Sequence, residues 1–218
     1  NYAQGFKAPS PMQVNNFFEN PLFGYESIPN PDLTPETSES IEGGFRFRNL
    51  DAFGGNLSLS TTAFHTDYDD FINQIVVRGT GVPGSDPLIY QYVNLSKVKI
   101  WGLEARGDIR WDNGVSTIVA ASFADGEQET DGERGALTSI DPIKVVAGLN
   151  YAAPSGVWGG GATVTWSDDK SNHDCGGGLC WPGEAFAILD LTAFWNVTEK
   201  ATLRAGVFNV FDEKYAWW

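Results

Sequence analysis

The sequence is poor in several features that would point to a familiar class of protein. It has only two cysteines, Cys175 and Cys180, so no second pair can complete a four-cysteine metal site. It has no apolar run near the roughly 20 residues that a transmembrane helix needs. Positive charge is also scarce, with 14 Lys and Arg against 28 Asp and Glu. Nucleic acid is therefore not expected as a partner, because binding it requires a basic surface.

Catalytic patterns are missing as well. The chain shows no mutually supporting Ser/His/Asp set, no phosphate-binding loop and no pair of carboxylates placed for acid–base work. We therefore do not expect an enzyme. What the sequence does have is 13% aromatic residues and 25 glycines, which favours many strands joined by tight turns.

The stretch Leu95–Trp111 shows the strand pattern most clearly. Its odd positions from Trp101 to Trp111 are apolar, aromatic or small, and charged residues fill four successive even positions. A period of two indicates a strand with two different faces. An apolar face bounded by tryptophans, opposite a charged face, is typical of a transmembrane barrel strand with lipid outside and water inside. The charged positions are Glu104, Arg106, Asp108 and Arg110.

Similar alternation predicts about nine strands along the chain. The predicted fold is therefore all-β, an antiparallel transmembrane β-barrel. In the strand predicted over Thr37–Arg48, Arg46 lies on the lumen face. The predicted strands cover residues 1–6, 37–48, 57–77, 95–111, 115–125, 137–152, 161–168, 186–197 and 201–211.

The connections between these strands alternate between short and long. Outer-membrane barrels have short periplasmic turns on one rim and long extracellular loops on the other, whereas a soluble sandwich has no reason for such sorting. The long connections, predicted to be irregular, would then lie outside the cell. Short connections are 49–56, 112–114, 153–157 and 198–200; long connections are 7–36, 78–88, 126–136 and 169–184.

The cysteine pair lies within the last long connection. Cys175 and Cys180 enclose four residues, and in an oxidising compartment this spacing suits a small loop disulfide. Half of a metal site is the alternative. The chain also begins inside a strand without a signal peptide, and bacterial barrels close with an even number of strands, so we expect a fragment of a longer protein.

Several motifs resemble those of TonB-dependent outer-membrane receptors, and among them the haem and haemoglobin receptors. The resemblance covers nearly the whole chain. N-P-D-L-T-P-E and the motif ending in E-K-Y are specific to these receptors in general, and S-I-D-P-I-K indicates the haem group. The matching stretches are Gly5–Pro9 (GFKAP), Asn30–Glu36 (NPDLTPE), Tyr68–Ile72 (YDDFI), Asn94–Glu104 (NLSKVKIWGLE), Ser139–Lys144 (SIDPIK) and Gly206–Tyr215 (GVFNVFDEKY).

The resemblance implies that residues 1–218 are the C-terminal part of a 22-strand barrel in the outer membrane of a Gram-negative bacterium. The last strand, the plug domain and the TonB box would lie outside this chain. The implied function is energised uptake of haem, taken from haemoglobin or another haem protein, with haem as the transported ligand and no permanently bound cofactor. The implied partners are the TonB complex, reached through the missing N-terminal region, and outer-membrane lipid. A siderophore or other metal-complex receptor is the alternative, followed by a passive porin-like or adhesive barrel.

The resemblance also suggests ligand contacts in the extracellular loops. Haem receptors carry an iron-ligating His between the boxes that match here at residues 5–9 and 30–36, but residues 10–29 contain none. Tyr25 is the only Tyr in that loop and could supply an oxygen ligand. Packing against a neighbour is its alternative role. The other candidate contacts are Phe23, His173, Trp181 and, where the family usually has Arg, Lys7, which could instead shape the base of the loop.

Charged residues on the strands have two possible roles. Glu104, Arg106, Asp108, Arg110 and Arg46 face the lumen and would contact a plug, or simply water. His65 falls on the lipid side near the outer rim, at an interfacial position. Asp67, Asp69 and Asp70 form a solvated rim or a cation site.

Overall fold

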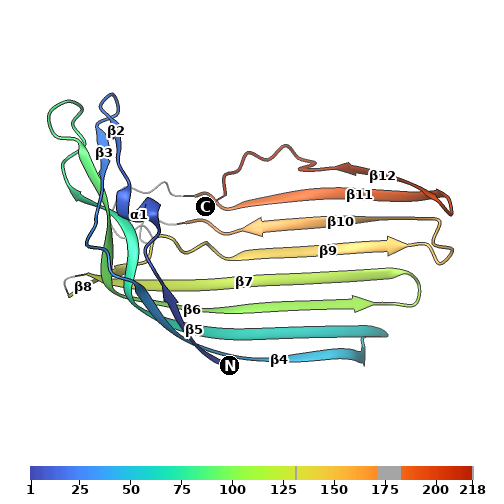
Figure 1. The fold of residues 1–218 in the computed structure, drawn as a ribbon. Helices are drawn as coiled ribbons and strands as arrows, with labels where there is room; N and C mark the ends of the chain where they lie inside the picture. Colours follow the sequence, from blue (N-terminus) through green and yellow to red (C-terminus); the bar gives the residue numbers. More distant parts are fainter. Residues whose placement is uncertain (131, 171–182, 218) are drawn as a thin grey trace. The chain divides into compact units, whose positions relative to one another are not determined.

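The fold was analysed in a computed structural model that describes residues 1–130, 132–170 and 183–217. Nine strands follow one another in a single antiparallel order, β1-β4-β5-β6-β7-β9-β10-β11-β12, which confirms the predicted all-β fold and strand number (Figure 1). Their bounds are β1 Tyr2–Lys7, β4 Glu36–Ala52, β5 Gly55–Arg78, β6 Leu88–Arg110, β7 Val115–Thr130, β9 Lys144–Ala152, β10 Trp158–Ser167, β11 Phe186–Thr198 and β12 Ala201–Val207.

Three shorter strands and one helix complete the described elements. Strand β2 (Phe18–Asn20) pairs with β3 (Tyr25–Ile28), and β3 also pairs in parallel with β6. Strand β8 (Glu133–Ala136) pairs with the end of β7, and the helix α1 spans Pro11–Asn15. Among the described residues, no helix is both long and apolar enough to cross a bilayer.

The chain divides into two compact units. The first contains residues 1–41, 65–100 and 126–137, and so holds α1, β1, β2, β3 and β8. The second contains residues 42–64, 101–125 and 138–218, and so holds β9 to β12. Strands β4 to β7 contribute residues to both units, since their long pleated runs continue through the boundary positions.

The register of the second unit places the predicted lipid-facing residues opposite one another. Leu149 of β9 lies opposite Thr117 and Ala162, and Ala162 lies opposite Leu191. Leu191 in turn lies opposite Val207. A slip of one residue in any pair would move one strand's apolar set to the other face. The observed register is therefore the one that the alternation in the sequence predicts.

This apolar face is open to the surroundings. Leu149 is 55% exposed and Leu203 is 61% exposed, and Trp158 and Trp195 lie opposite each other on the same face. A soluble sheet would cover such a face with a second layer. The arrangement suits a barrel wall whose outer surface contacts lipid tails. The fully buried side chains, Leu95 and Val98, lie in the first unit instead.

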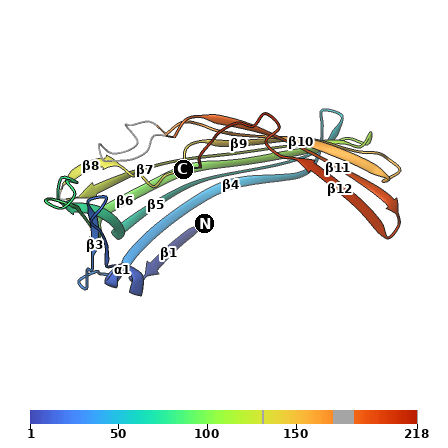
Figure 2. The same ribbon diagram turned by 90° about the horizontal axis from the view of Figure 1, so that it is seen from above.

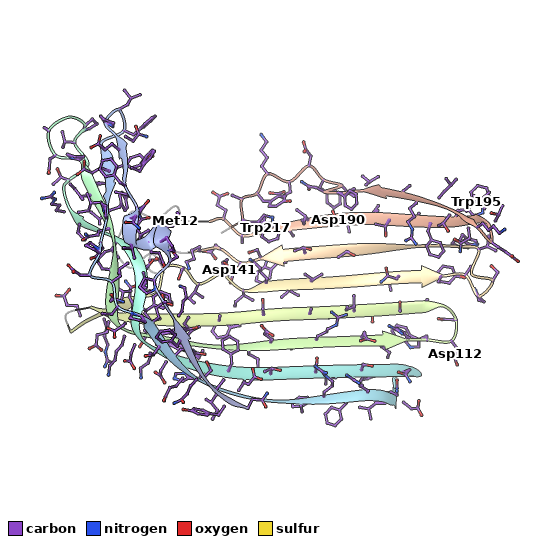
Figure 3. The ribbon with its side chains drawn as sticks, in the orientation of Figure 1. Met12, Asp112, Asp141, Asp190, Trp195 and Trp217 are labelled. Atoms are coloured by element: carbon purple, nitrogen blue, oxygen red, sulfur yellow. The ribbon has the colours of Figure 1, made fainter. Side chains whose placement is uncertain are left out.

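The short turns lie together at one end of the second unit, as predicted. Figure 1 shows the β6–β7, β9–β10 and β11–β12 turns at that end. In Figure 3, Asp112 and Trp195 mark this end, whereas Asp141 and Trp217 lie toward the opposite end of the same strands. Figure 2 shows the β11–β12 hairpin from above, with its turn at the same end. Because consecutive strands are antiparallel neighbours, successive connections alternate between the two ends of the strands. The short connections therefore fall at one end.

The long connection 7–36 is more ordered than predicted. Ser10 and Gln13 form a capping box, in which Ser10 Oγ accepts from Gln13 N at 3.2 Å and Gln13 Oε1 accepts from Ser10 N at 2.9 Å. With Pro11 at the first position, this is enough to start the short helix α1. The prediction of an irregular loop was wrong here, because the β2–β3 hairpin also gains support from β6, which the local sequence does not reveal.

Other predicted boundaries were also wrong. Strand β6 begins at Leu88 and not at Leu95, and β12 ends at Val207 and not at Phe211. The predicted acidic loop 126–136 is largely a hairpin, since β7 continues to Thr130 and pairs with β8. The strand predicted from residue 137 begins only at Lys144. Pro142 explains this delay, because it has no amide hydrogen for a strand ladder.

An arginine should affect the free energy of unfolding differently on the two faces of β11. Leu191→Arg places a charge on the lipid face and should lower the free energy of unfolding by about 2–4 kcal/mol if the site lies near the bilayer midplane. Thr192→Arg, one residue along, points between Gly161 and Gly206 on the other face and should be close to neutral. Urea unfolding of the full-length receptor in phospholipid vesicles measures both. Equal losses for the two variants would contradict the assignment of faces.

Candidate functional site

In the first unit, hydrogen bonds hold the segment between β1 and β4 against the neighbouring strands. Asn94 in β6 carries three of the hydrogen bonds. Its Nδ2 donates to the carbonyls of Thr34 at 2.9 Å and Asp70 at 2.7 Å, and its Oδ1 accepts from Thr34 N at 2.9 Å. Asp70 has a positive φ of 59°, so this bond lies where β5 bends locally. One side chain thus links three separate parts of the chain.

Asn30 makes a second connection at the base of this segment. Its Nδ2 donates to Tyr92 O at 2.8 Å, and its backbone N donates to Val14 O at 3.0 Å. Gln91 adds a bond from its Nε2 to Pro29 O at 2.8 Å. The end of α1, the start of the NPDLTPE motif and β6 are therefore held together.

A buried carboxylate closes the same region. Glu36 has a side chain that is only 7% exposed and accepts from Lys7 Nζ at 3.1 and 3.2 Å. It also accepts from the backbone N of Ile72 at 2.9 Å. Burial of a carboxylate is tolerated when a charge partner and an amide satisfy it. Lys7, predicted as a ligand contact or a loop-shaping residue, here pairs with Glu36.

These contacts bring together four of the motifs that the sequence analysis singled out. GFKAP supplies Lys7, NPDLTPE supplies Thr34 and Glu36, and the remaining partners come from YDDFI and from the start of NLSKVKIWGLE. Their shared role in the structure is to fix the base of the segment 8–35. We refer to this set of hydrogen bonds around Asn30, Glu36 and Asn94 as the loop clamp.

Tyr25 lies on β3, which directly precedes the NPDLTPE motif along the chain. Its hydroxyl accepts from Asn20 Nδ2 at 3.1 Å, and its ring is 5.9 Å from Phe18 and 6.3 Å from Tyr90, the latter edge to face. The ring therefore packs on neighbours while the hydroxyl keeps acceptor capacity. Phe23 lies in the turn of the hairpin and is exposed. His173, Trp181, Cys175 and Cys180, with the predicted disulfide, fall outside the described residues.

In the second unit, an aromatic cluster joins two further motifs. Phe186 stacks on Tyr215 at 4.6 Å between ring centroids, and Trp217 packs edge to face on both. Lys144 Nζ lies 5.2 Å from the Trp217 ring centroid and 2.6 Å from Asp141 Oδ2. Asp141 and Trp217 lie near each other in Figure 3. SIDPIK and the segment after β12 thus meet through a cation–π contact, while the ion pair lies within SIDPIK itself.

Asn209 explains how that last segment turns back. It has a φ of 49°, a conformation that Asn tolerates better than most residues. Its side chain exchanges two hydrogen bonds with the backbone of Glu213, each at 2.9 Å, and its backbone N donates to Asp190 Oδ1 at 2.8 Å. The motif could be recognised in the sequence, but this role of Asn209 could not.

The charged face predicted for the lumen lines two hollows in the second unit. A hollow of about 500 Å³ has Arg46, Glu104, Arg106 and Lys144 among its lining residues. A second hollow, of about 310 Å³, includes Arg46, Arg106 and Asp108. The structure thus brings together four of the five predicted lumen residues, and Lys144, whose strand position also faces the lumen, joins them. Cations outnumber the single carboxylate in the larger hollow, so it would attract an acidic surface.

Arg110, predicted to face the lumen, and Asp67, predicted to be part of a solvated rim or a cation site, each lie near oppositely charged side chains. Arg110 lies at the edge of the charged face, with its Nε 4.0 Å from Asp108 Oδ2. Asp67 lies between His65 Nε2 at 3.1 Å and Lys99 Nζ at 3.5 Å. No group of three potential metal ligands occurs within residues 1–130, 132–170 and 183–217. Asp67 is therefore part of a polar cluster that contains its own cation.

The sequence as a whole is similar to known proteins. A family model described as "TonB dependent receptor-like, beta-barrel" matches residues 1–210. The chain is 29% identical over 248 residues to "Hemoglobin-haptoglobin utilization protein B" of Neisseria meningitidis serogroup C, and the match covers all of this chain. It spans 30% of the length of that relative.

Two solved structures share the fold. The copper transporter OprC superimposes with a TM-score of 0.77 at 20% identity, covering 99% of this chain and 32% of that one. A double mutant of the Serratia marcescens hemophore receptor HasR, in complex with its hemophore HasA and heme, gives a TM-score of 0.73 at 20% identity. That match covers 99% of this chain and 34% of HasR.

The loop clamp predicts a loss of stability when either partner of its ion pair is removed. Glu36→Ala leaves the Ile72 amide without an acceptor in a buried place, which should lower local stability by about 1–3 kcal/mol. Lys7→Ala should lower it by at least as much, because the Glu36 carboxylate, only 7% exposed, then has no charge partner. Hydrogen–deuterium exchange of peptides that contain Ile72 measures the local opening.

Glu36→Gln serves as the matched control for this prediction. It keeps an oxygen acceptor for the Ile72 amide and should preserve most of the protection. Exchange that is unchanged in Glu36→Ala would contradict the importance of the buried carboxylate.

Proposed function

Since the chain belongs to the TonB-dependent receptor-like β-barrel family, whose members are outer-membrane proteins of Gram-negative bacteria, we propose that it is the C-terminal part of a receptor that takes up haem. The haem would come from haemoglobin or another haem protein. Energy for uptake would come from the TonB complex, acting through a part of the receptor outside residues 1–218. The wall described here performs no chemistry and serves to bind and pass the ligand.

This proposal rests mainly on the match to a haemoglobin-haptoglobin utilization protein along the whole chain. The geometry of the first unit supports it, because the loop clamp holds an aromatic hairpin in place. Aromatic side chains suit the flat apolar face of haem. Tyr25 offers a hydroxyl oxygen as an iron ligand where related receptors have His. Phe23, His173, Trp181 and Lys7 remain the other proposed ligand contacts.

Uptake of a different metal complex, such as a siderophore, is the second candidate. The absence of His from residues 10–29 favours it, as imidazole is a common haem ligand. The fold likeness to a copper transporter agrees with a metal-related cargo in general but shows the fold alone. A passive porin-like or adhesive barrel is less well supported, because the charged hollows suit a bound plug.

We further propose that Arg46, Glu104, Arg106, Asp108 and Arg110 face an internal plug. The larger hollow is lined by two arginines and one carboxylate, besides Lys144, which pairs with Asp141, so the opposing plug surface is expected to be acidic. Contacts between charged groups in water-filled surroundings are individually weak, so such a plug could be held and still be moved.

Haem titration of the full-length receptor tests the proposed ligand. The wild type should develop a shifted Soret band, and Tyr25→Phe should weaken binding by about tenfold, which corresponds to about 1.4 kcal/mol. Tyr90→Phe is the matched control, because Tyr90 packs on the same ring. A wild type without Soret change would favour the siderophore candidate. Normal binding by Tyr25→Phe would exclude Tyr25 as the ligand.

Charge reversal on the hollow tests the proposed plug contact. The double variant Arg46→Glu/Arg106→Glu should reduce growth on haem as the sole iron source by about tenfold, since like charges across an interface are strongly unfavourable. Haem binding at the cell surface should stay within about twofold, because the loops are untouched. Lys200→Glu, in the exposed β11–β12 turn, controls for charge alone. Full growth of the double variant would contradict the plug contact.

A further inference from the structure

The β2–β3 hairpin carries exposed apolar side chains that lipid does not account for. Leu22 is 81% exposed and Phe23 is 70% exposed, and Phe17 and Phe18 just before them are also exposed. These residues lie in the segment 8–35, which connects β1 to β4 on the side of the long loops and outside the alternating wall strands. Figure 1 shows the hairpin standing beside the loop between β5 and β6, both in the first unit. A concentrated apolar patch away from lipid marks an interaction surface.

Two acidic residues face each other across the same hairpin. Glu19 on β2 lies directly opposite Glu26 on β3. Like charges in opposite positions of an antiparallel pair repel each other. Among the residues that the structure describes, no cation pairs with either carboxylate. A Lys or Arg from outside would relieve this repulsion, so the hairpin presents a vacant position for positive charge beside apolar side chains.

The edge of the hairpin favours a polypeptide over a small molecule. Strand β2 pairs only with β3 within the described sheet, which leaves its other edge open. An open edge offers backbone donors and acceptors that another chain can use.

The hairpin is also held ready for binding. Leu88 N donates to Gly24 O at 2.8 Å, and Tyr25–Ile28 pair in parallel with Leu88–Gln91. Gly24 has a φ of 68°, and a Cβ there would come within 3.1 Å of backbone atoms of Gly81 and Pro83. Close packing against the β5–β6 loop therefore fixes the turn. Less conformational freedom is then lost on association, which favours affinity.

We propose that the β2–β3 hairpin is a docking site for the protein that delivers haem, through a basic side chain next to an apolar surface. Leu22 would enter the apolar surface, while Glu19 and Glu26 would pair with the basic group. The site is separate in role from the proposed haem contact of Tyr25. This proposal rests on the proposed function, since it assumes that a haem protein is the source of the ligand.

The test compares two probes, haemoglobin and free haem, on the full-length receptor in detergent. Leu22→Ser and, separately, Glu19→Gln/Glu26→Gln should each weaken haemoglobin binding at least about tenfold. A loss of that size is typical when an interface residue that contributes much of the binding energy is truncated. Free haem affinity should stay within about twofold, because the docking side chains do not ligate it. The glutamine variant should also lose most of the salt dependence of haemoglobin binding.

Phe53→Ser is the control, because Phe53 is an equally exposed apolar residue in the short β4–β5 turn, which belongs to the second unit. It should bind both probes normally. Hydrogen exchange of β6 peptides reports whether a hairpin variant is still folded. Should the serine variant lose protection there, the glutamine variant, which keeps the side-chain volumes, decides the result.

The outcomes separate the two proposals. Normal haemoglobin binding by both hairpin variants overturns the docking site and leaves the proposed function standing. Parallel loss of free haem and haemoglobin also overturns it, because the hairpin would then belong to the haem site. A wild type that binds neither probe overturns the proposed function and the docking site together.

Discussion

The structure depends on one constraint, which is that backbone amides and carbonyls cannot be left unpaired in lipid. An antiparallel ladder satisfies them strand by strand, so each strand must keep its register with both neighbours. The register observed from β7 to β12 does this and places Leu149, Ala162, Leu191 and Val207 on one face. The exposed apolar face and the charged face with its hollows are both consequences of the same ladder.

Outside the regular strands, side chains supply the hydrogen bonds that the backbone groups need. Where the backbone leaves regular strands, Asn30, Asn94 and Asn209 supply donors and acceptors to carbonyls and amides that strands would otherwise pair. Asn is suited to this because one short side chain offers both functions. Most motifs by which the sequence resembles its relatives thus coincide with hydrogen-bonded positions. Such residues build the frame of the barrel wall.

This distinction explains how much could be predicted from the sequence. Period-two alternation predicted the strands, both faces and the sorting of turns, since these depend on neighbours in the chain and on lipid. The helix α1 was missed although Ser10, Pro11 and Gln13 give a recognisable signal. The loop clamp could not be predicted, because Asn94 and Thr34 are 60 residues apart and meet only once the register is known. For the same reason Lys144 was not recognised as a neighbour of Arg46.

The loop clamp has a consequence for how such receptors can diversify. All of its bonds lie at the base of the segment 8–35 or on the strands beneath it, and they involve backbone groups or residues such as Asn94 and Glu36. None of them uses a side chain between Phe17 and Phe23. Residues in that interval can therefore be exchanged, or their number changed, at little energetic expense to the wall. Mutation can then change the surface that this segment presents, while the barrel wall beneath continues to fold as before.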